Sequence, residues 1–521
     1  MMKEIYQRAR RVVVWAGADW TAGPAAILLM EMFTAEAQYD GTPADFYKFF
    51  FQDRYSRRWK ALMELFRNEY LNRVWCVQEV SVGRSVHLLH GGLYIPWEIF
   101  VGVMHWCFQD QIRPLLGPES SVITTPWHPT ARTFENAAVM LNLRQGDSDQ
   151  YYPGLAENQN WFQFENLMFM CHNFQATNPS DKIFALIGMA QDDMNELLEV
   201  DYTKSTADVY IDAAEYVVQF GTFPTHMLAI AGTGYGRNID DLPSWVPDHS
   251  FNRPNYPLTD ATLKSWFYRA APPFPSAISL TEKRGCLVLH GRIIDSILDT
   301  HDDAVFLRIE GTEEQNVPTF LQSLRIRRKF YDAAANLVEQ NRHVLNHLPD
   351  VYDTLYVTLT GDRIEHKRIY HAAFSSKKTH DTSLIENIRR AHNLWLAQST
   401  VLSTVQSTDE IASLPAKDQA HLVSIFSEDQ KLMVNYYTAM LECSYGRRFC
   451  ITERGTMALV PPLTRKGDLV AVVSGGQTPV VLRKKEGRED GAYELVGEGY
   501  FYGYMDGEAG DMGKSQELLI V

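Results

Sequence analysis

The segment RVWCVQEV, residues 73–80, places one carboxylate in an otherwise apolar helical pattern. In a helix, Glu79 lies one turn after Trp75 on the same face, so the acid would lie against an indole ring. Such a carboxylate is either a poised catalytic group or a polar residue at the edge of a packed helix, paired with Arg73 or a backbone donor. Arg73 would orient a phosphate or, as we favour, neutralise Glu79. The candidate catalytic residues are Glu79, Trp75 and Arg73.

A second set of candidates could line a pocket. PSWVPD, residues 243–248, has two prolines that fix an extended loop, in which Trp245 is expected to be buried. Asp248 could instead face a cleft as an acid or base. The cluster YFYGY, residues 500–504, alternates at the period of a strand, so one face would be core and the other would line an aromatic pocket or a partner surface. The candidate substrate-binding residues are Trp245, Asp248, Tyr500, Tyr502 and Tyr504.

No motif for a metal or cofactor stands out. The six cysteines form no CxxC pair. HVLNH, residues 343–347, has the spacing of metal ligands on a helix but lacks the glutamate of HExxH and an obvious third ligand. Phosphate-loop and Rossmann fingerprints are absent from the sequence, and the glycines near 474–477 and 497–508 are typical of hairpin turns. We therefore expect no metal and no bound cofactor.

Composition and charge exclude two classes of partner. Lys and Arg total 49 against 64 Asp and Glu, which gives a formal net charge of −15. An acidic chain lacks the cation density that nucleic-acid backbones require, and RIRRK at 325–329 has the pattern of a solvated helix face. No segment approaches the ~20 apolar residues of a membrane span. Reduced, mostly buried cysteines further indicate a cytoplasmic protein.

Hydrophobic periodicity divides the 521 residues into parts of different character. VVVWAG, residues 12–17, is a buried strand, residues 58–82 have a helical period, and SVHLLHGGLYIPW is a hairpin about two glycines. Residues 110–160 are rich in Pro, Gly, Asp and Asn and are expected to form a long excursion. A strand pair is expected around GCLVLHGRIIDSI, a mainly helical region follows, and strands with tight turns end the chain. The expected boundaries are 1–110 for an α/β portion, 111–317 for its continuation with long loops, 318–445 for the helical region, and 446–521 for an antiparallel β-rich module.

The order of these segments resembles the fungal heterokaryon-incompatibility (HET) family. The likeness runs through IYQRARRVVVWAG, LNRVWCVQEVSVGRSVHLLHGG, DKIFALIGMAQDD, DYTKSTADVY and LPSWVPD, and then through RRFCITERG, KGDLVAVVSGG, PVVLR and YELVGEGYFYGYMDGEA. It covers both ends and the middle of the chain, whereas residues 318–445 are least distinctive. The resemblance rests on many short matches in the right order.

HET domains are similar to TIR domains, which have a flavodoxin-like parallel sheet wrapped by helices. In enzymatic TIR domains, a Glu in a Trp-Cys-x-x-Glu helix cleaves the nicotinamide–ribose bond of NAD, and Trp75, Cys76 and Glu79 match that pattern. The resemblance thus implies a TIR-like sheet, NAD as a possible substrate, and Glu79 as the group that stabilises an oxocarbenium-like centre or anchors a ribose hydroxyl. HET domains usually carry two further strands before the point where this chain begins, so we expect an N-terminally shortened sheet.

Three function classes remain open at this stage. The family implies an incompatibility or cell-death effector that acts through protein contacts, with residual NAD hydrolysis. A repurposed, cofactor-independent cyclase or isomerase of fungal secondary metabolism, similar to a pericyclase, would bind an apolar small molecule in an aromatic-lined pocket. A non-catalytic interaction scaffold would need only a partner protein. The sequence leaves the oligomeric state open.

Overall fold

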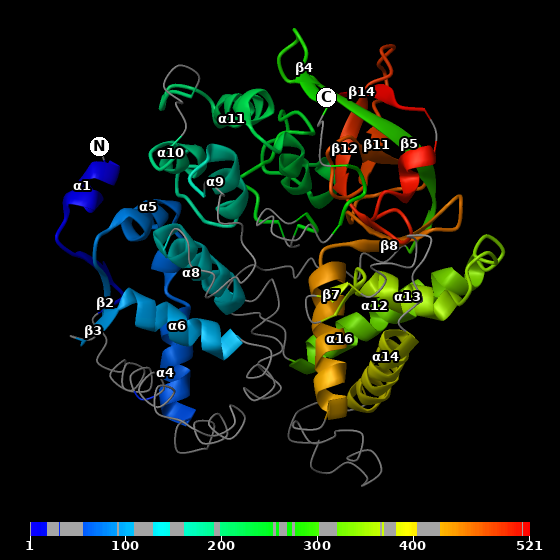
Figure 1. Ribbon diagram of the computed structural model, residues 1–521, viewed down its shortest axis with the longest axis horizontal. Helices are drawn as coiled ribbons and strands as arrows, with labels where there is room; N and C mark the ends of the chain where they lie inside the picture. The colour runs from blue at the N-terminus through cyan, green and yellow to red at the C-terminus, as the bar shows by residue number, and fades with distance from the viewer. Residues whose placement is uncertain are drawn as a thin grey trace. The chain divides into compact units, whose positions relative to one another are not determined.

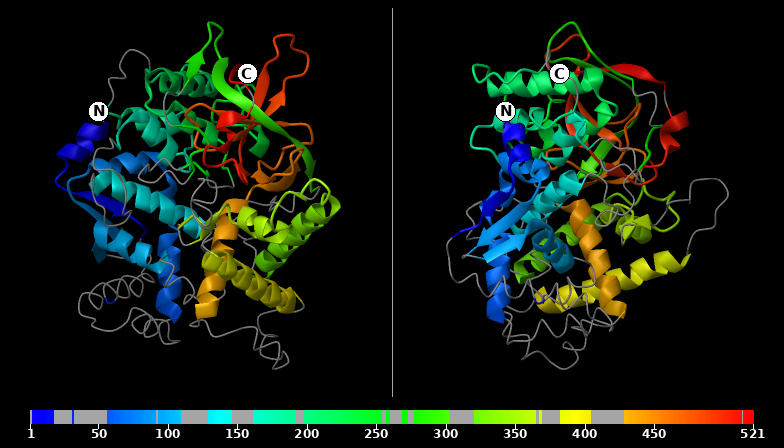
Figure 2. Two further views of the ribbon diagram at one scale, coloured as in Figure 1. Left: turned by 45° about the vertical axis from the view of Figure 1, so that its right-hand side comes forward. Right: turned by 60° about the vertical axis from the view of Figure 1, so that its left-hand side comes forward.

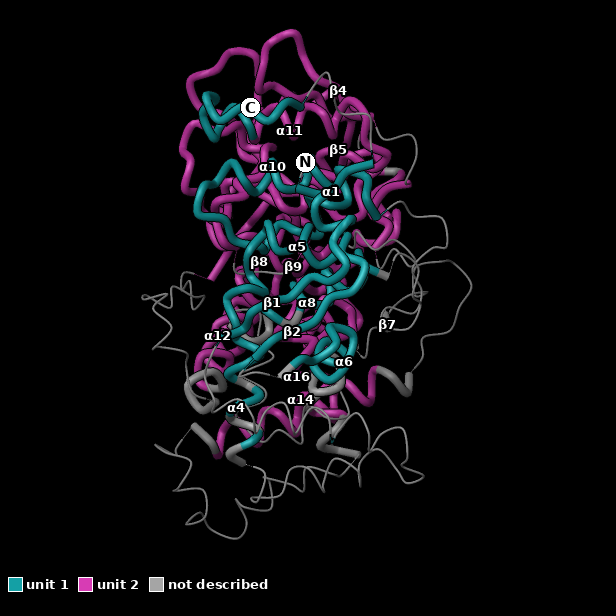
Figure 3. Tube along the Cα trace, turned by 90° about the vertical axis from the view of Figure 1, so that its left-hand side faces the viewer, with its two compact units in different colours: residues 1–209 teal, residues 210–521 magenta. Residues whose placement is uncertain are grey.

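The computed structural model divides the chain into two compact units, residues 1–209 and residues 210–521 (Figure 3). The four-part division expected from the sequence stays a prediction. The structure describes residues 2–17, 31, 56–90, 93–108, 129–145, 161–191, 198–253, 257–259, 268–272, 277–301, 320–364, 367–368, 382–403, 428–512 and 514–521.

The first unit contains a small mixed sheet in the order β1–β2–β3. β1 (Val12–Trp15) pairs in parallel with β2 (Val86–His90), and β2 pairs antiparallel with β3 (Leu93–Pro96). The hairpin expected from the sequence is confirmed, although its two glycines lie outside the described residues. A wholly parallel sheet is therefore wrong for the described part, because the short connection between β2 and β3 reverses the chain direction.

Helices surround this sheet (Figure 1). The helix expected over 58–82 is interrupted, because the Asn68 side chain accepts the Tyr70 N–H and starts a separate 3₁₀ turn. Residues 129–145, expected within a long excursion, form a helix instead. α5 contacts α1, α8 and α10. The helices of this unit are α1 (Met2–Arg8), α4 (Ser56–Phe66), η3 (Glu69–Asn72), α5 (Val74–Val82), α6 (Trp97–Phe108), α8 (Pro129–Gln145), α9 (Phe164–Met170) and α10 (Asp181–Ile187).

The second unit is built on a largely antiparallel sheet that closes on itself. The path β10–β11–β12–β14–β5 returns to its start because β5 also pairs with β10. Only β12 and β14 are parallel among the described pairs of this sheet. The strand pair expected around GCLVLHGRIIDSI is present, since this segment forms the long strand β5 and pairs antiparallel with the short strand before it, β4. β5 also joins the C-terminal strands. The strands of this sheet are β4 (Ile278–Leu280), β5 (Leu287–Thr300), β8 (Arg448–Thr452), β9 (Met457–Val460), β10 (Leu469–Val473), β11 (Val480–Lys484), β12 (Tyr493–Glu498), β13 (Tyr500–Phe501) and β14 (Gln516–Ile520).

The helical middle region is confirmed in its described parts and packs on this sheet through contacts of α12 with β8 and of α13 with β9 (Figure 2). RIRRK does not form a wholly solvated face, since Arg327 is buried with its guanidinium over the Tyr437 ring. None of the described helices has both the length and the apolar character needed to cross a bilayer. The helical elements are α11 (Thr206–Phe220), which begins before the boundary between the units, η5 (Pro224–Ile230), η6 (Thr233–Tyr235), α12 (Phe320–Gln340), α13 (Val351–Leu359), α14 (Thr382–Ser403), α16 (Glu428–Ser444) and η8 (Glu508–Asp511), with a short hairpin of β6 (Arg363–Ile364) and β7 (Lys367–Arg368).

Candidate functional site

Helix α5 is held rigidly at both ends. At its start, the Val74 N–H donates to the Gln175 carbonyl at 2.9 Å, and the Gln175 N–H returns a bond to the Asn72 carbonyl at 2.5 Å. At its end, Gly83 lies so close to β1 that a Cβ there would come within 2.8 Å of Val12 Cγ2. The orientation of α5 is therefore fixed by contacts to a loop and to the sheet, and Glu79 is carried on that fixed helix.

Two tyrosines from other elements face the Glu79 carboxylate. The Tyr70 hydroxyl, on η3, donates to Glu79 Oε2 at 2.9 Å. The Tyr6 hydroxyl, on α1, lies within hydrogen-bonding reach of the same carboxylate. Burial, reinforced by the negative charge of Glu79, raises the pKa of Tyr6 to about 12. Burial raises the pKa of Tyr70 as well, with smaller contributions from Cys76 and Glu79. Both phenols thus keep their protons near neutral pH, and the Tyr70 hydroxyl donates to the acid.

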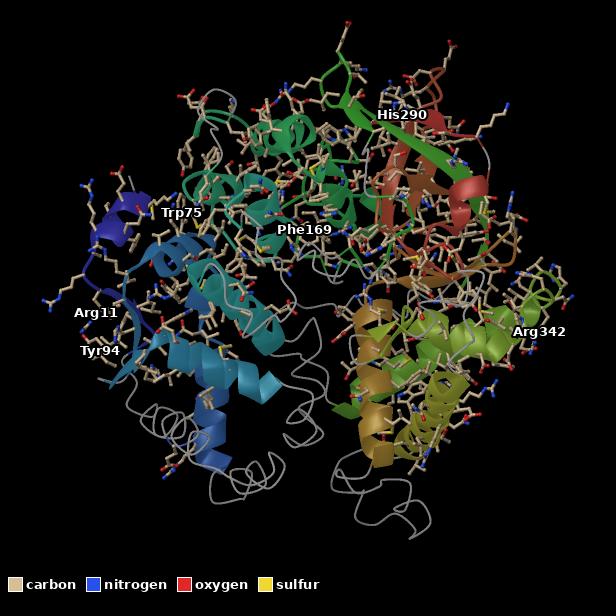
Figure 4. The ribbon with its side chains drawn as sticks, in the orientation of Figure 1. Arg11, Trp75, Tyr94, Phe169, His290 and Arg342 are labelled. Carbon is tan, nitrogen blue, oxygen red and sulfur yellow. The ribbon has the colours of Figure 1, made fainter. Side chains whose placement is uncertain are left out.

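The other members of the Trp-Cys-x-x-Glu pattern have different surroundings. Cys76 is buried, and burial followed by the Glu79 charge raises the pKa of its thiol to about 12, so it is no nucleophile near neutral pH. Trp75 is half-buried (Figure 4). Arg73 is exposed, and the described side chains include no ion pair between it and Glu79. The contact that the structure gives the Glu79 carboxylate is the hydrogen bond from the Tyr70 hydroxyl, and a role for Arg73 beside Glu79 stays a prediction.

The position of the Glu79 carboxylate limits the chemistry that this site could perform. A half-buried carboxylate that is held by the Tyr70 hydroxyl is the kind of group that can stabilise a developing cation or accept a hydrogen bond from a ribose hydroxyl. Sequence reasoning missed Tyr6 and Tyr70, because both belong to elements that reach Glu79 only through tertiary packing. Among the residues that the structure describes, no cluster of His, Cys, Asp and Glu has the geometry of a metal site.

Trp245 and Asp248, in the second unit, form hydrogen bonds to backbone groups of the surrounding loops. The Trp245 side chain is fully buried and its indole Nε1 donates to the Gly285 carbonyl at 3.0 Å. Asp248 accepts the backbone N–H groups of Asn238 at 2.7 Å, and of Ile239 and Ser250 at 3.0 Å each. These bonds hold the loop that the two prolines fix. A role for either residue in substrate binding stays a prediction.

The three tyrosines do not share one strand face. β13 contains only Tyr500 and Phe501, and both are buried, so the expected alternation is wrong. The Tyr500 ring lies 6.0 Å from that of Tyr268, and Tyr504 packs in the core of the sheet. Tyr502 is half-buried and its backbone N–H bonds the Met457 carbonyl at 3.0 Å. The three tyrosines thus have different surroundings. A role for them in substrate binding stays a prediction.

A buried charged pair inside the second unit was also missed. Glu498, at the end of β12, and Arg447, between α16 and β8, are 1% and 0% exposed and lie 3.2 Å apart. Glu498 also accepts the N–H of Thr259 at 3.2 Å and its hydroxyl at 3.0 Å, as well as the hydroxyl of Thr478 at 3.2 Å. The acid is satisfied entirely from within the fold, so its contacts are structural.

Comparisons with known proteins agree with this two-part architecture. Residues 1–79, which end at Glu79, match the family described as heterokaryon incompatibility protein (HET), and residues 285–521 match the Het-6 beta-barrel domain. A relative from Neurospora crassa, "Heterokaryon incompatibility protein 6, OR allele", is 25% identical over 371 residues, covering 66% of this chain and 51% of the relative. The chain thus spans about half the length of that relative. No solved structure matches the chain. The chain thus carries a HET segment at residues 1–79 and a Het-6 beta-barrel domain at residues 285–521.

Proposed function

We propose that this chain acts in fungal heterokaryon incompatibility as an effector of cell death. The observation that carries the proposal is the presence of both family segments in one chain, together with a relative whose printed name is that of an incompatibility protein. Because the chain covers half of that relative, the cellular role is inferred for this chain and needs its own test.

The chemistry we propose for the effector is hydrolysis of NAD at Glu79. The carboxylate would stabilise positive charge on the ribose as the nicotinamide–ribose bond breaks and its electron pair leaves with nicotinamide. Water then bonds to the ribose carbon and loses a proton. Three features support this: the Trp75–Glu79 spacing on α5, a carboxylate held by Tyr70, and the parallel β1–β2 pair that a TIR-like sheet requires.

Release of nicotinamide from NAD by the purified full chain tests this chemistry. The wild type is expected to release nicotinamide in a time- and enzyme-dependent manner, whereas Glu79→Gln should not, since the amide lacks the negative charge. Glu69→Gln is the matched control, because Glu69 is exposed on the neighbouring η3 and should leave the rate unchanged. Absence of release from the wild type, or equal release from Glu79→Gln, would overturn the NAD proposal.

The other function classes make different predictions. An interaction scaffold needs no carboxylate, so it would cause cell death equally well with Glu79→Gln. A cyclase would need an aromatic pocket, and no contact of the described residues favours one, since Trp245, Asp248 and Tyr500 are engaged with neighbouring groups of the fold. The effector role with Glu79 as its reactive group is therefore the function we put forward.

A further inference from the structure

The turn η3, which precedes helix α5, is held in place at both of its ends. At its start, Asn68 Oδ1 accepts the Tyr70 N–H, and Asn68 Nδ2 donates to the Ala16 carbonyl just after β1, each at 3.0 Å. At its other end, the buried Asn136 of α8 donates through Nδ2 to Asn72 Oδ1 at 3.1 Å. Side-chain amides therefore tie η3 to the sheet and to α8, and the backbone of Tyr70 has a fixed position.

This fixed turn brings the Tyr70 hydroxyl to the acid on the next helix. The hydroxyl donates to Glu79 Oε2 at 2.9 Å, and both side chains are half-buried. A glutamate side chain has three torsions, so without a partner the Glu79 carboxylate would populate several staggered rotamers. A hydrogen bond to a charged group favours one of them by about tenfold or more. Tyr70 thus selects one orientation of the carboxylate.

We propose that Tyr70 is a positioning residue for the reaction at Glu79, because its hydroxyl holds the carboxylate in the orientation that stabilises positive charge on the ribose. This inference rests on the NAD hydrolysis proposed above. A charge that is already in place stabilises a transition state without the cost of reorientation during the reaction. Tyr70 acts through Glu79 and makes no contact with the substrate. Loss of the hydroxyl should therefore slow the chemical step and leave substrate binding unchanged.

Steady-state release of nicotinamide by the purified full chain, with kcat and KM measured separately, tests this role. Tyr70→Phe keeps the ring and removes the hydroxyl, so kcat should fall about tenfold. KM should stay within about twofold of the wild-type value, since the lost contact lies within the protein. Tyr94→Phe is the matched control, because Tyr94 is an exposed tyrosine on β3, and both of its constants should equal those of the wild type.

Two further variants separate positioning from a general effect on the fold. Incorporation of 4-aminophenylalanine in place of Tyr70 restores an N–H donor at the same place on the ring, so it should recover most of the lost rate. Asn68→Ala releases the start of η3 but keeps the Tyr70 hydroxyl, and it should lower kcat as well. Added to Tyr70→Phe, it should cause no further loss, because both changes act through one contact. Thermal unfolding followed by circular dichroism identifies the variants that are folded at the assay temperature.

The outcomes distinguish this role from the proposed function. A wild type that releases no nicotinamide overturns NAD hydrolysis and the role of Tyr70 with it. An active wild type beside a folded Tyr70→Phe variant of equal kcat overturns the role of Tyr70 alone. A raised KM with unchanged kcat also overturns it, because Tyr70 would then contact the substrate. Equal losses from Asn68→Ala in the presence and absence of the Tyr70 hydroxyl would show that η3 does not act through Tyr70, which overturns the proposal as well.

Discussion

The buried pair of Glu498 and Arg447 allows the sharpest stability prediction. Glu498→Gln keeps the volume of the side chain but removes its charge, and one acceptor oxygen becomes a donor facing the hydroxyls of Thr259 and Thr478. Arg447, fully buried, then loses its counter-charge at 3.2 Å. Removing one partner of a buried ion pair costs ~3–5 kcal/mol, so Glu498→Gln should lower the free energy of unfolding of the second unit by about that amount.

The assay is urea unfolding followed by circular dichroism and tryptophan fluorescence. Glu494→Gln is the control, since Glu494 lies on the same strand and its ion pair with Lys485 is partly exposed. Pairs of that kind are worth about 0–1 kcal/mol. Arg447→Met, alone and combined with Glu498→Gln, completes a double-mutant cycle. The double variant should be less destabilised than the sum of the two single variants, because it leaves no unpaired buried charge.

Two outcomes would refute this reasoning. Glu498→Gln could lower the free energy of unfolding no more than Glu494→Gln does. The buried ion pair would then contribute no more to stability than the partly exposed one. Alternatively, the effects of Arg447→Met and Glu498→Gln could add, which would mean that the two charges do not interact. Either result would remove the physical basis for treating this pair as a structural centre of the second unit.

Two further predictions concern titratable groups. Burial lowers the pKa of the His392 imidazole from 6.5 to about 3 in the folded chain. Between pH 6.5 and pH 3, therefore, the unfolded chain binds a proton at His392 and the folded chain does not. The stability that neutral His392 contributes is present above pH 6.5 and is lost as the pH falls toward 3. At about pH 5 this proton uptake lowers the free energy of unfolding by about 2 kcal/mol. His392→Phe should remove that part of the pH dependence, as measured by urea unfolding. A variant with the same pH dependence as the wild type would contradict this prediction. Cys76, with its pKa raised to about 12, should resist iodoacetamide at pH 8 in the native chain and react on unfolding. Rapid native alkylation of Cys76, located by mass spectrometry, would show that its thiol is accessible and ionised.

Local patterns in the sequence predicted local structure well. The helical period around RVWCVQEV put Trp75 and Glu79 on one helix, and the glycine pair predicted the β2–β3 hairpin. The helix over 58–82 was predicted without its break, since the competing side-chain cap at Asn68 has no distinctive spacing. Periodicity thus predicted elements and their types, and failed where a single side chain changed the backbone.

Tertiary partners could not be predicted from the sequence. Tyr6 reaches Glu79 from α1 because α1 packs on α5, and no spacing along the chain encodes that contact. Arg327 is covered by Tyr437, a residue more than a hundred positions later, so a basic run that reads as solvated is partly buried. The same reason explains why β5 joins strands that begin after residue 446.

We propose that this chain kills cells by consuming NAD at Glu79. The most direct test is to express the full chain from an inducible promoter in a filamentous fungus and to measure cellular NAD together with viability. The wild type and Glu69→Gln should lower NAD before viability falls, whereas Glu79→Gln, expressed to the same level, should change neither. Cell death without loss of NAD, or death that persists with Glu79→Gln, would contradict it.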